Sequence, residues 1–194
     1  MSGFTTSGAD WYLMRASGVM TLVLLTAVFV LGIATTTRWR GRSLPGFAAV
    51  SLHRSISLLS VVFLAVHIAT AVVDPYAAVN VASIVIPFVA GKSAFWVGLG
   101  AVSLDLTLAL IVTSLLRSRI SLRVWRGVHW AAYLSWPLAL LHSLGVGSDT
   151  GTLGLRAIAA VCVASVVAAV VWRRQQANGP EKRLAPRRPA HHHA

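Results

Sequence analysis

Four histidines in apolar surroundings are the residues of this chain best suited to chemistry. His53 and His67 lie 14 residues apart in one hydrophobic run, and His129 and His142 lie 13 apart in another. At ~1.5 Å rise per residue, each pair is separated by roughly 20 Å along a helix. That distance is most of the roughly 30 Å thickness of a hydrocarbon core, so each helix would offer one imidazole near each membrane face.

The two pairs match in depth if both helices cross the membrane in the same direction. His53 would then face His129 at an inner level, and His67 would face His142 at an outer level. Imidazole is a good iron ligand, and a haem held between two histidines has both axial positions filled. The four residues therefore predict two stacked b-type haems. Their attachment is expected to be non-covalent, because a single cysteine excludes a CxxCH motif.

Other interpretations of the histidines remain open from the sequence. A single histidine in a membrane helix can simply hydrogen-bond to a neighbouring helix. A transporter's proton relay is the functional rival, with Asp105 as the acid inside a span. The spacing of 13 residues also leaves His129 and His142 about 140° apart on an ideal helix. We expect a kink at Pro137 to re-aim one of them.

The composition indicates that lipid is the solvent of the elements carrying these residues. Hydrophobic residues make up 56% of the 194, the mean hydropathy is +0.73, and only 11% are charged, against about 25% in typical soluble chains. Runs of about 20 apolar residues suffice to span a bilayer as helices. We predict an all-α integral membrane bundle of about five transmembrane helices, at residues 13–37, 47–73, 93–116, 125–147 and 154–172.

The basic residues orient this bundle. They gather in the loop at 38–42, the loop at 117–126 and the tail after 172, and clusters of this kind mark cytoplasmic loops. They give no sign of nucleic-acid binding, despite a net charge of +12. We therefore place the N-terminus outside and the C-terminus in the cytoplasm of a cell-membrane protein. Residues 75–91, which include Pro87, are expected to form an outer, interfacial or re-entrant loop.

The expected organisation is one membrane domain with short ends. Residues 1–10 form an outer segment, residues 11–173 the membrane domain, and residues 174–194 a disordered basic cytoplasmic tail. The tract His191–His193 in that tail is assigned no function.

Several other side chains are candidates to support a haem. Arg54 and Arg126 flank the inner histidines and Arg15 lies near the outer level, where each could bind a propionate; the alternative for each is snorkelling to lipid phosphate. Trp136 lies between the two levels, where it could pack between haems or simply fill the core. Asp105 must be paired or protonated at its depth, and could serve a proton or quinone site or bond a neighbouring helix.

The pattern resembles the ferric-reductase-like transmembrane domain over residues 11–173. That superfamily includes ferric reductases, NADPH oxidases and the haem subunit of a bacterial methionine-sulfoxide reductase system. Its signature is two histidine pairs on two helices, 14 apart in one and 13 or 14 apart in the other. The flanking motifs that support the resemblance are Arg15-Ala-Ser-Gly18, Thr113-Ser-Leu-Leu-Arg117, Trp125-Arg126 before His129-Trp130, and Leu141-His142-Ser-Leu-Gly145.

The sequence also departs from the larger members of that superfamily. Ferric reductases and NADPH oxidases append flavin and nicotinamide domains, whereas only about twenty residues follow Trp172 here. The glycines of Gly98-Leu-Gly100 do not indicate a dinucleotide-binding motif, because they lie in an apolar helix, where they favour close packing. The resemblance therefore implies a haem-only electron-transfer subunit that takes electrons from quinol or a redox partner protein. Its acceptor could be ferric iron, oxygen or another protein. The alternative is a non-enzymatic haem-binding subunit, carrier or sensor in a larger complex.

Overall fold

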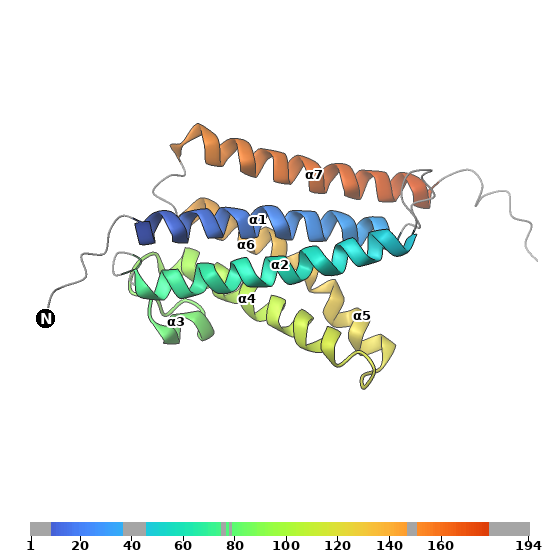
Figure 1. Ribbon diagram of the computed structural model, residues 1–194, viewed down its shortest axis with the longest axis horizontal. Helices are drawn as coiled ribbons and strands as arrows, with labels where there is room; N and C mark the ends of the chain where they lie inside the picture. Colours follow the sequence, from blue (N-terminus) through green and yellow to red (C-terminus); the bar gives the residue numbers. More distant parts are fainter. Residues whose placement is uncertain (1–8, 37–45, 75–76, 78, 147–150, 179–194) are drawn as a thin grey trace, which may run out of the picture.

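The computed structural model consists of helices and short connections over the residues it describes, which are 9–36, 46–74, 77, 79–146 and 151–178. The helices are α1 (Ala9–Thr36), α2 (Gly46–Val73), α3 (Val81–Val85), α4 (Ala94–Leu115), α5 (Leu122–Trp130), α6 (Ala132–Val146) and α7 (Leu153–Ala177). Figure 1 shows the long helices running side by side along one axis. The prediction of an all-α membrane bundle is confirmed.

Within the described residues, four helices are long and apolar enough to cross a membrane: Asp10–Thr35, Phe47–Val73, Ala94–Leu115 and Leu153–Ala177. They correspond to four of the five expected spans. The fifth expected span, 125–147, consists of α5 and α6, which together run from one end of the bundle to the other (Figure 1). The last span also continues further than expected, because α7 remains helical to Ala177. The tract His191–His193 lies outside the described residues.

The expected single helix at 125–147 is broken at Ala131, six residues before the proline. The N–H of Ala131 donates to the carbonyl of Val128 at 2.8 Å, a tight turn, and its own carbonyl then accepts from Leu134 and Ser135 at 3.0 Å each. Pro137 lies inside the second helix, α6, which continues through it. Proline lacks an N–H and crowds the carbonyl four residues before it, so the turns just before a proline are the weakest part of a helix. His129 and His142 are consequently on separate helices, and the ideal-helix angle between them does not apply.

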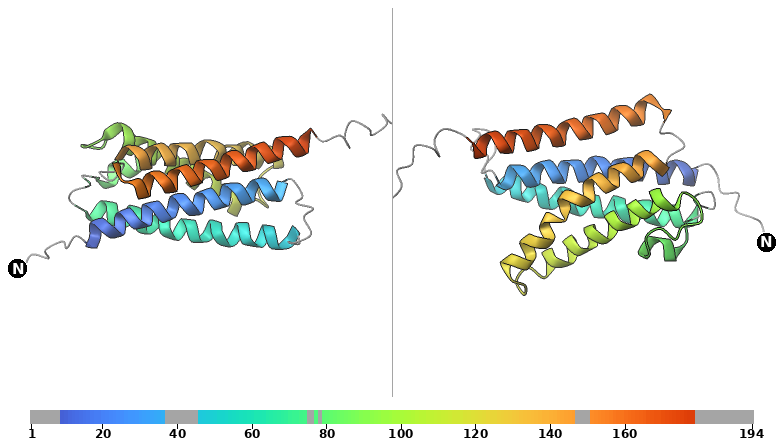
Figure 2. Two further views of the ribbon diagram at one scale, coloured as in Figure 1. Left: turned by 90° about the horizontal axis from the view of Figure 1, so that it is seen from above. Right: turned by 180° about the vertical axis from the view of Figure 1, so that it is seen from behind.

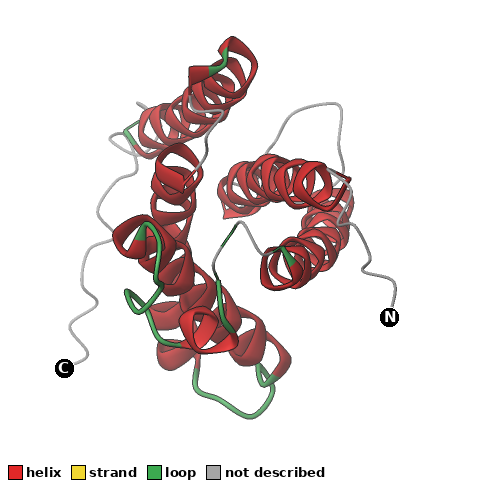
Figure 3. Cartoon of the chain, turned by 90° about the vertical axis from the view of Figure 1, so that its left-hand side faces the viewer, coloured by secondary structure: helices red, strands yellow, loops and turns green. Residues whose placement is uncertain are grey.

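The helices form two antiparallel pairs. α1 packs along the whole of α2, α4 packs on α6, and α1 also contacts α6 and α7. Figure 2 shows α7 lying along α1, and Figure 3, seen end-on, shows the N-terminal pair on one side and a curved row of helices on the other. Because α2 and α6 belong to different pairs, the histidines they carry lie on opposite sides of the space between those pairs.

Small polar residues let α1 pack closely at the centre of this arrangement. Ser17, Thr21 and Thr26 are buried, and each hydroxyl donates to the carbonyl four residues earlier, at 2.6 to 2.8 Å. Such bonding within a helix satisfies hydroxyl groups where no water is present. The hydrophobic core beside them consists of Leu22, Trp136, Cys162 and Val166.

The segment before α4 caps one end of the bundle. Its helix α3 has five residues and begins at a capping box, in which Asn80 and Ser83 exchange hydrogen bonds of 2.8 and 3.0 Å. Five residues are far too few to cross a bilayer. In the described part of 75–91 the chain therefore returns without a spanning helix, as the sequence predicts.

Candidate functional site

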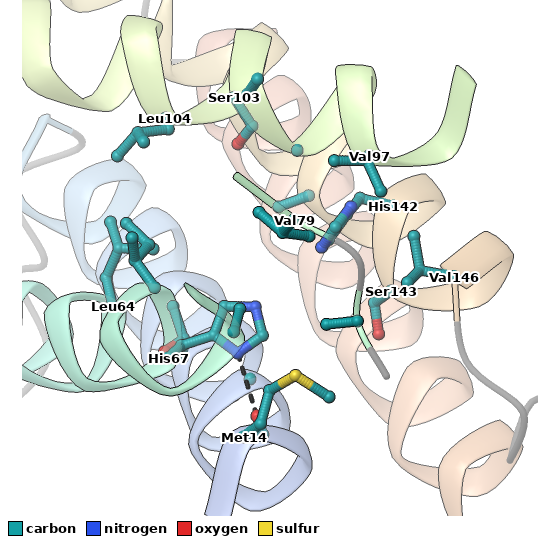
Figure 4. Close-up of a pocket in the computed structure, with 18 of the residues that line it drawn as sticks. Met14, Leu64, His67, Val79, Val97, Ser103, Leu104, His142, Ser143 and Val146 are labelled. Carbon is teal, nitrogen blue, oxygen red and sulfur yellow. Dashed lines mark hydrogen bonds between the residues drawn. The ribbon is translucent and has the colours of Figure 1, made fainter. Parts of the chain in front are cut away.

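His67 of α2 and His142 of α6 face each other in a cavity between the two helix pairs. Their ring centroids are 6.3 Å apart and their planes are inclined at 77°. The cavity has a volume of about 330 Å³, which is within the usual range for small-molecule sites. Figure 4 shows both imidazoles projecting into it from opposite sides. The predicted outer pair is therefore brought together.

Each ring of the outer pair is anchored through its Nδ1 atom to a helix carbonyl. His67 Nδ1 lies 2.9 Å from the carbonyl oxygen of Met14 on α1, and His142 Nδ1 lies 2.9 Å from that of Trp96 on α4. A carbonyl only accepts hydrogen bonds, so Nδ1 carries the proton in both rings and Nε2 keeps its lone pair. That tautomer and fixed ring orientation are what a metal-ligating histidine requires.

A glycine four residues after each carbonyl makes room for the imidazole. A Cβ atom on Gly18 would lie 2.9 Å from the His67 ring, and one on Gly100 would lie 2.6 Å from His142 Nδ1. Helical side chains lean toward the N-terminus, so the residue at i+4 covers the carbonyl of residue i. Glycine leaves that carbonyl open on its second lone pair. We call this pairing of a carbonyl at i with a glycine at i+4 the glycine notch.

The same notch recurs at the inner level against His53. A Cβ atom on Gly32 would lie 3.5 Å from the His53 ring, and the ring faces the carbonyl of Val28, four residues before that glycine. Here Nδ1 is buried but does not reach hydrogen-bond geometry. Gly18 and Gly32 are 14 residues apart on α1, which repeats in reverse the spacing of His67 and His53 on antiparallel α2.

His129 is held differently from the other three histidines. It lies within electrostatic range of His53, its predicted partner, but unlike the outer pair the two do not share the cavity that holds His67 and His142. Its ring stacks on Trp125 with centroids 4.4 Å apart and planes at 24°, and its Nδ1 is buried without a hydrogen bond. The positions 13 and 14 residues beyond Gly100 on α4 are Thr113 and Ser114, so no glycine occurs there.

Charged residues gather at the outer end of the cavity. Arg15, Asp74 and Lys92 contribute to its wall, and Asp74 is only 4% exposed. The guanidinium of Arg15 also lies 5.6 Å from the centre of the Trp11 ring, a cation–π distance. The expected position of Arg15 at the outer level therefore coincides with the wall of the cavity.

The other sequence candidates lie outside this cavity. Arg54 and Arg126 are exposed at the inner level. Trp136 is 8% exposed, donates from Nε1 to the hydroxyl of Thr26 at 2.9 Å and packs in the core between α1 and α7. Asp105 is exposed on α4 and contributes nothing to the cavity wall.

The outer pair fits a haem better than it fits a metal ion held by protein alone. Two imidazole–metal bonds of about 2 Å each, added to the distance from each ring centre to its nitrogen, come to about 6 Å. The centroid separation of 6.3 Å agrees with that sum. Among the described residues no group of three or more His, Cys, Asp or Glu could hold a metal ion. Two axial imidazoles with an apolar surround are the donor set that an iron porphyrin needs.

Sequence reasoning missed the notch residues. Neither the carbonyl of Met14 nor that of Trp96 leaves any mark in a side-chain pattern. The glycines do leave a signal, because the interval between Gly18 and Gly32 equals the interval between the two histidines of α2. The expected close packing at Gly98-Leu-Gly100 is present, with Gly98 against Phe88 and Gly100 against His142.

Comparison with known proteins agrees with this geometry. The family model described as "Ferric reductase like transmembrane component" matches residues 17–140, which is more than half of the chain and includes His53, His67 and His129. No curated protein and no solved structure gives a significant match. The chain therefore belongs to the ferric-reductase-like transmembrane family.

Proposed function

We propose that this protein holds two b-type haems, one above the other, and passes electrons across the membrane. His67 and His142 would be the axial ligands of the outer haem, and His53 and His129 those of the inner haem. Membership of the family supports transmembrane electron transfer in general terms. The number of haems, their ligands and the electron acceptor are parts of this proposal.

The observation that carries the proposal is the geometry of the outer pair. Two imidazoles from different helices meet in one cavity, each with Nδ1 engaged by a carbonyl and Nε2 left for a ligand. A histidine that served only to link two helices would need the hydrogen bond to the neighbouring carbonyl, but it would not need a second imidazole opposite it. Here two such rings face each other, and the space between them lies between the two helix pairs.

When bound, haem supplies the reversible one-electron chemistry of its iron. The residues of this chain do the rest. The carbonyls of Met14 and Trp96 would fix the imidazole orientation, and the largely apolar wall would surround the porphyrin. Arg15, in the cavity wall at the outer level, would bind a propionate there, and Arg54 and Arg126, exposed at the inner level, would do so at that level. Trp136, in the core between the two levels, would fill the space beside the haems.

The orientation of the bundle in the membrane is part of the same proposal. The C-terminal ends of α4 and α7 and the start of α5 lie at one end (Figure 1), and Arg117, Arg123, Arg173 and Arg174 lie there. We take this basic end as cytoplasmic and the end with α3 as external, in a plasma membrane. Quinol or a redox partner protein would supply electrons, and ferric iron, oxygen or a partner would receive them.

A visible spectrum with a pyridine-haemochrome count on the purified protein tests the proposal. We expect about two b haems per chain, both six-coordinate, with reversible reduction by dithionite or quinol. The double variant His67→Ala with His142→Ala should retain about one haem, and a variant lacking all four histidines should retain none. A folded, colourless wild-type protein would refute the proposal and favour histidine-based transport.

A haem-binding carrier or sensor is the second candidate, and the inner pair favours it. Neither His53 nor His129 has its Nδ1 hydrogen-bonded, so the inner iron would be the more weakly ligated. Carriers and sensors need a haem that exchanges or takes up external ligands. A five-coordinate inner haem that binds carbon monoxide as rapidly as it is reduced would support this candidate over electron transfer.

A further inference from the structure

Asp105 lies at the middle of α4 and is exposed there. It is flanked by eleven helical residues before it and ten after it, so it is about 16 Å from either end of the helix. Its side chain is exposed, and within the described part of the chain it makes no hydrogen bond or ion pair.

The two sides of α4 have different surroundings. Val97, Gly100, Leu104 and Thr107 contribute to the wall of the cavity that holds His142. Asp105 lies on the other side, in a stripe with helical spacing that is apolar apart from the carboxyl group. We call it the Asp105 face; its members are Asp105, Leu108, Ala109, Val112 and Leu116.

No described helix covers this face. α4 packs on α6, and α3 and α5 contact it toward its two ends (Figure 1). Leu108, Val112 and Leu116 are 47%, 50% and 41% exposed, which is normal for residues that face lipid tails. A carboxyl group in the same stripe is not normal, because acids inside membranes almost always face the bundle interior or pair with another polar group.

The side chain of Asp105 cannot reach water at the membrane surface. An aspartate is too short to reach the interface from the bilayer centre, unlike arginine or lysine. Asp105 does not itself line the cavity, which reaches Ala101 one turn before it, so a proton or quinone site at the histidines does not include it directly. Of the two options for an acid at this depth, protonation and pairing, pairing requires a binding partner within the membrane.

We propose that the Asp105 face docks a transmembrane helix of a partner protein that carries an arginine or lysine at mid-bilayer depth. The apolar stripe suits a partner helix, Ala109 beside Asp105 allows close approach, and the carboxylate calls for an opposite charge. A second copy of this chain fits less well. The described basic side chain nearest that depth is Arg54, at the level of the inner histidines.

A synthetic membrane helix tests this charge preference without knowledge of the natural partner. The haem-loaded full chain is reconstituted in phosphatidylcholine vesicles with a dansyl-labelled polyleucine peptide that has one arginine at its centre. Energy transfer from the tryptophans of the protein to dansyl reports binding and does not depend on haem function. The same peptide with leucine at the centre is the reference, and Asp10→Asn, at the start of α1, is the matched charge control.

We expect the arginine peptide to bind wild type about tenfold more tightly than the leucine peptide, the size expected for one interhelical polar contact. Asp105→Leu and the near-isosteric Asp105→Asn should remove that preference, whereas Asp10→Asn should keep it. Equal binding of both peptides, or a preference that survives both Asp105 variants, would overturn the proposal. A wild-type dimer that disappears in both Asp105→Leu and Arg54→Gln would also overturn it, in favour of a second copy.

Discussion

The outer and inner histidine pairs share spacing and chemistry but differ in how firmly their rings are held. At the outer level both Nδ1 atoms are hydrogen-bonded at 2.9 Å to helix carbonyls, each beside a glycine. At the inner level one ring lies in a looser notch, and the other stacks on Trp125 with a buried, unbonded Nδ1. Two pairs of histidines therefore need not make equal sites, because the groups behind an imidazole set its orientation and basicity.

The break at Ala131 accounts for the different support of His129. It separates α5 from α6, so His142 stays packed against α4 while His129 is on a short helix that follows a separate course (Figure 1). The outer site is thus built from long helices that pack along their whole length. The inner site depends on a nine-residue helix, and short helices have little stability of their own.

The largest expected effect is the loss of the outer haem in His142→Gly. The substitution would remove one proposed axial ligand and leave a hole of imidazole size in the cavity wall. We expect one haem per chain instead of two, and recovery of the second when free imidazole is added. The haem count with and without imidazole measures this, and a variant that keeps two six-coordinate haems would contradict the assignment of His142.

Gly100→Ala should be the next most damaging change. Its Cβ would lie 2.6 Å from His142 Nδ1, whereas the Cβ of Gly18→Ala would lie 2.9 Å from the His67 ring. Overpacking of this kind costs about 1–3 kcal/mol, and displacing the ring should also shift the midpoint potential of the outer haem alone. A potentiometric titration checks this.

Gly127→Ala is the matched control for the two notch variants, because nothing lies within 4 Å of its Cβ position. It should leave both potentials and the haem count unchanged. If Gly127→Ala and Gly100→Ala behaved alike, the notch would have no special role.

Trp125→Leu should weaken the inner site and spare the outer one. The stacked ring of Trp125 is the main described support of His129, and aromatic pairs contribute about 0.5–1.5 kcal/mol beyond area burial. We expect faster transfer of the inner haem to apomyoglobin, with the outer haem retained at the wild-type rate. Equal release of both haems would indicate that the two sites are not independent.

Gly32→Ala gives the smallest expected effect. Unlike the other notch variants, it should leave thermal stability unchanged or raise it slightly. At 3.5 Å its Cβ would be in ordinary van der Waals contact with the His53 ring, while alanine favours a helix over glycine by about 0.8–1 kcal/mol. Thermal loss of the Soret band should therefore occur at the wild-type temperature or slightly above it. A marked destabilisation would show that the inner notch is as tight as the outer ones.

Much of this fold follows from physical constraints visible in the sequence. Apolar runs of bilayer length identify the spans, and histidine spacing of most of a bilayer thickness indicates paired sites at two depths. The break at Ala131 could not be predicted, because proline in a membrane helix can kink it, break it or leave it straight according to its neighbours. The exposure of Asp105 was equally hidden, since it depends on which face of α4 packs on α6.

The use of main-chain oxygen atoms to hold the outer rings affects how this protein can change in evolution. Any amino acid other than proline can present the carbonyls of positions 14 and 96 within a helix. The anchor therefore places no constraint on the side chains at those positions. Positions 18 and 100 have no such freedom. In diverging sequences we accordingly expect glycine to be retained at one position on α1 and one on α4, each facing an imidazole. The residues one helical turn before them should vary.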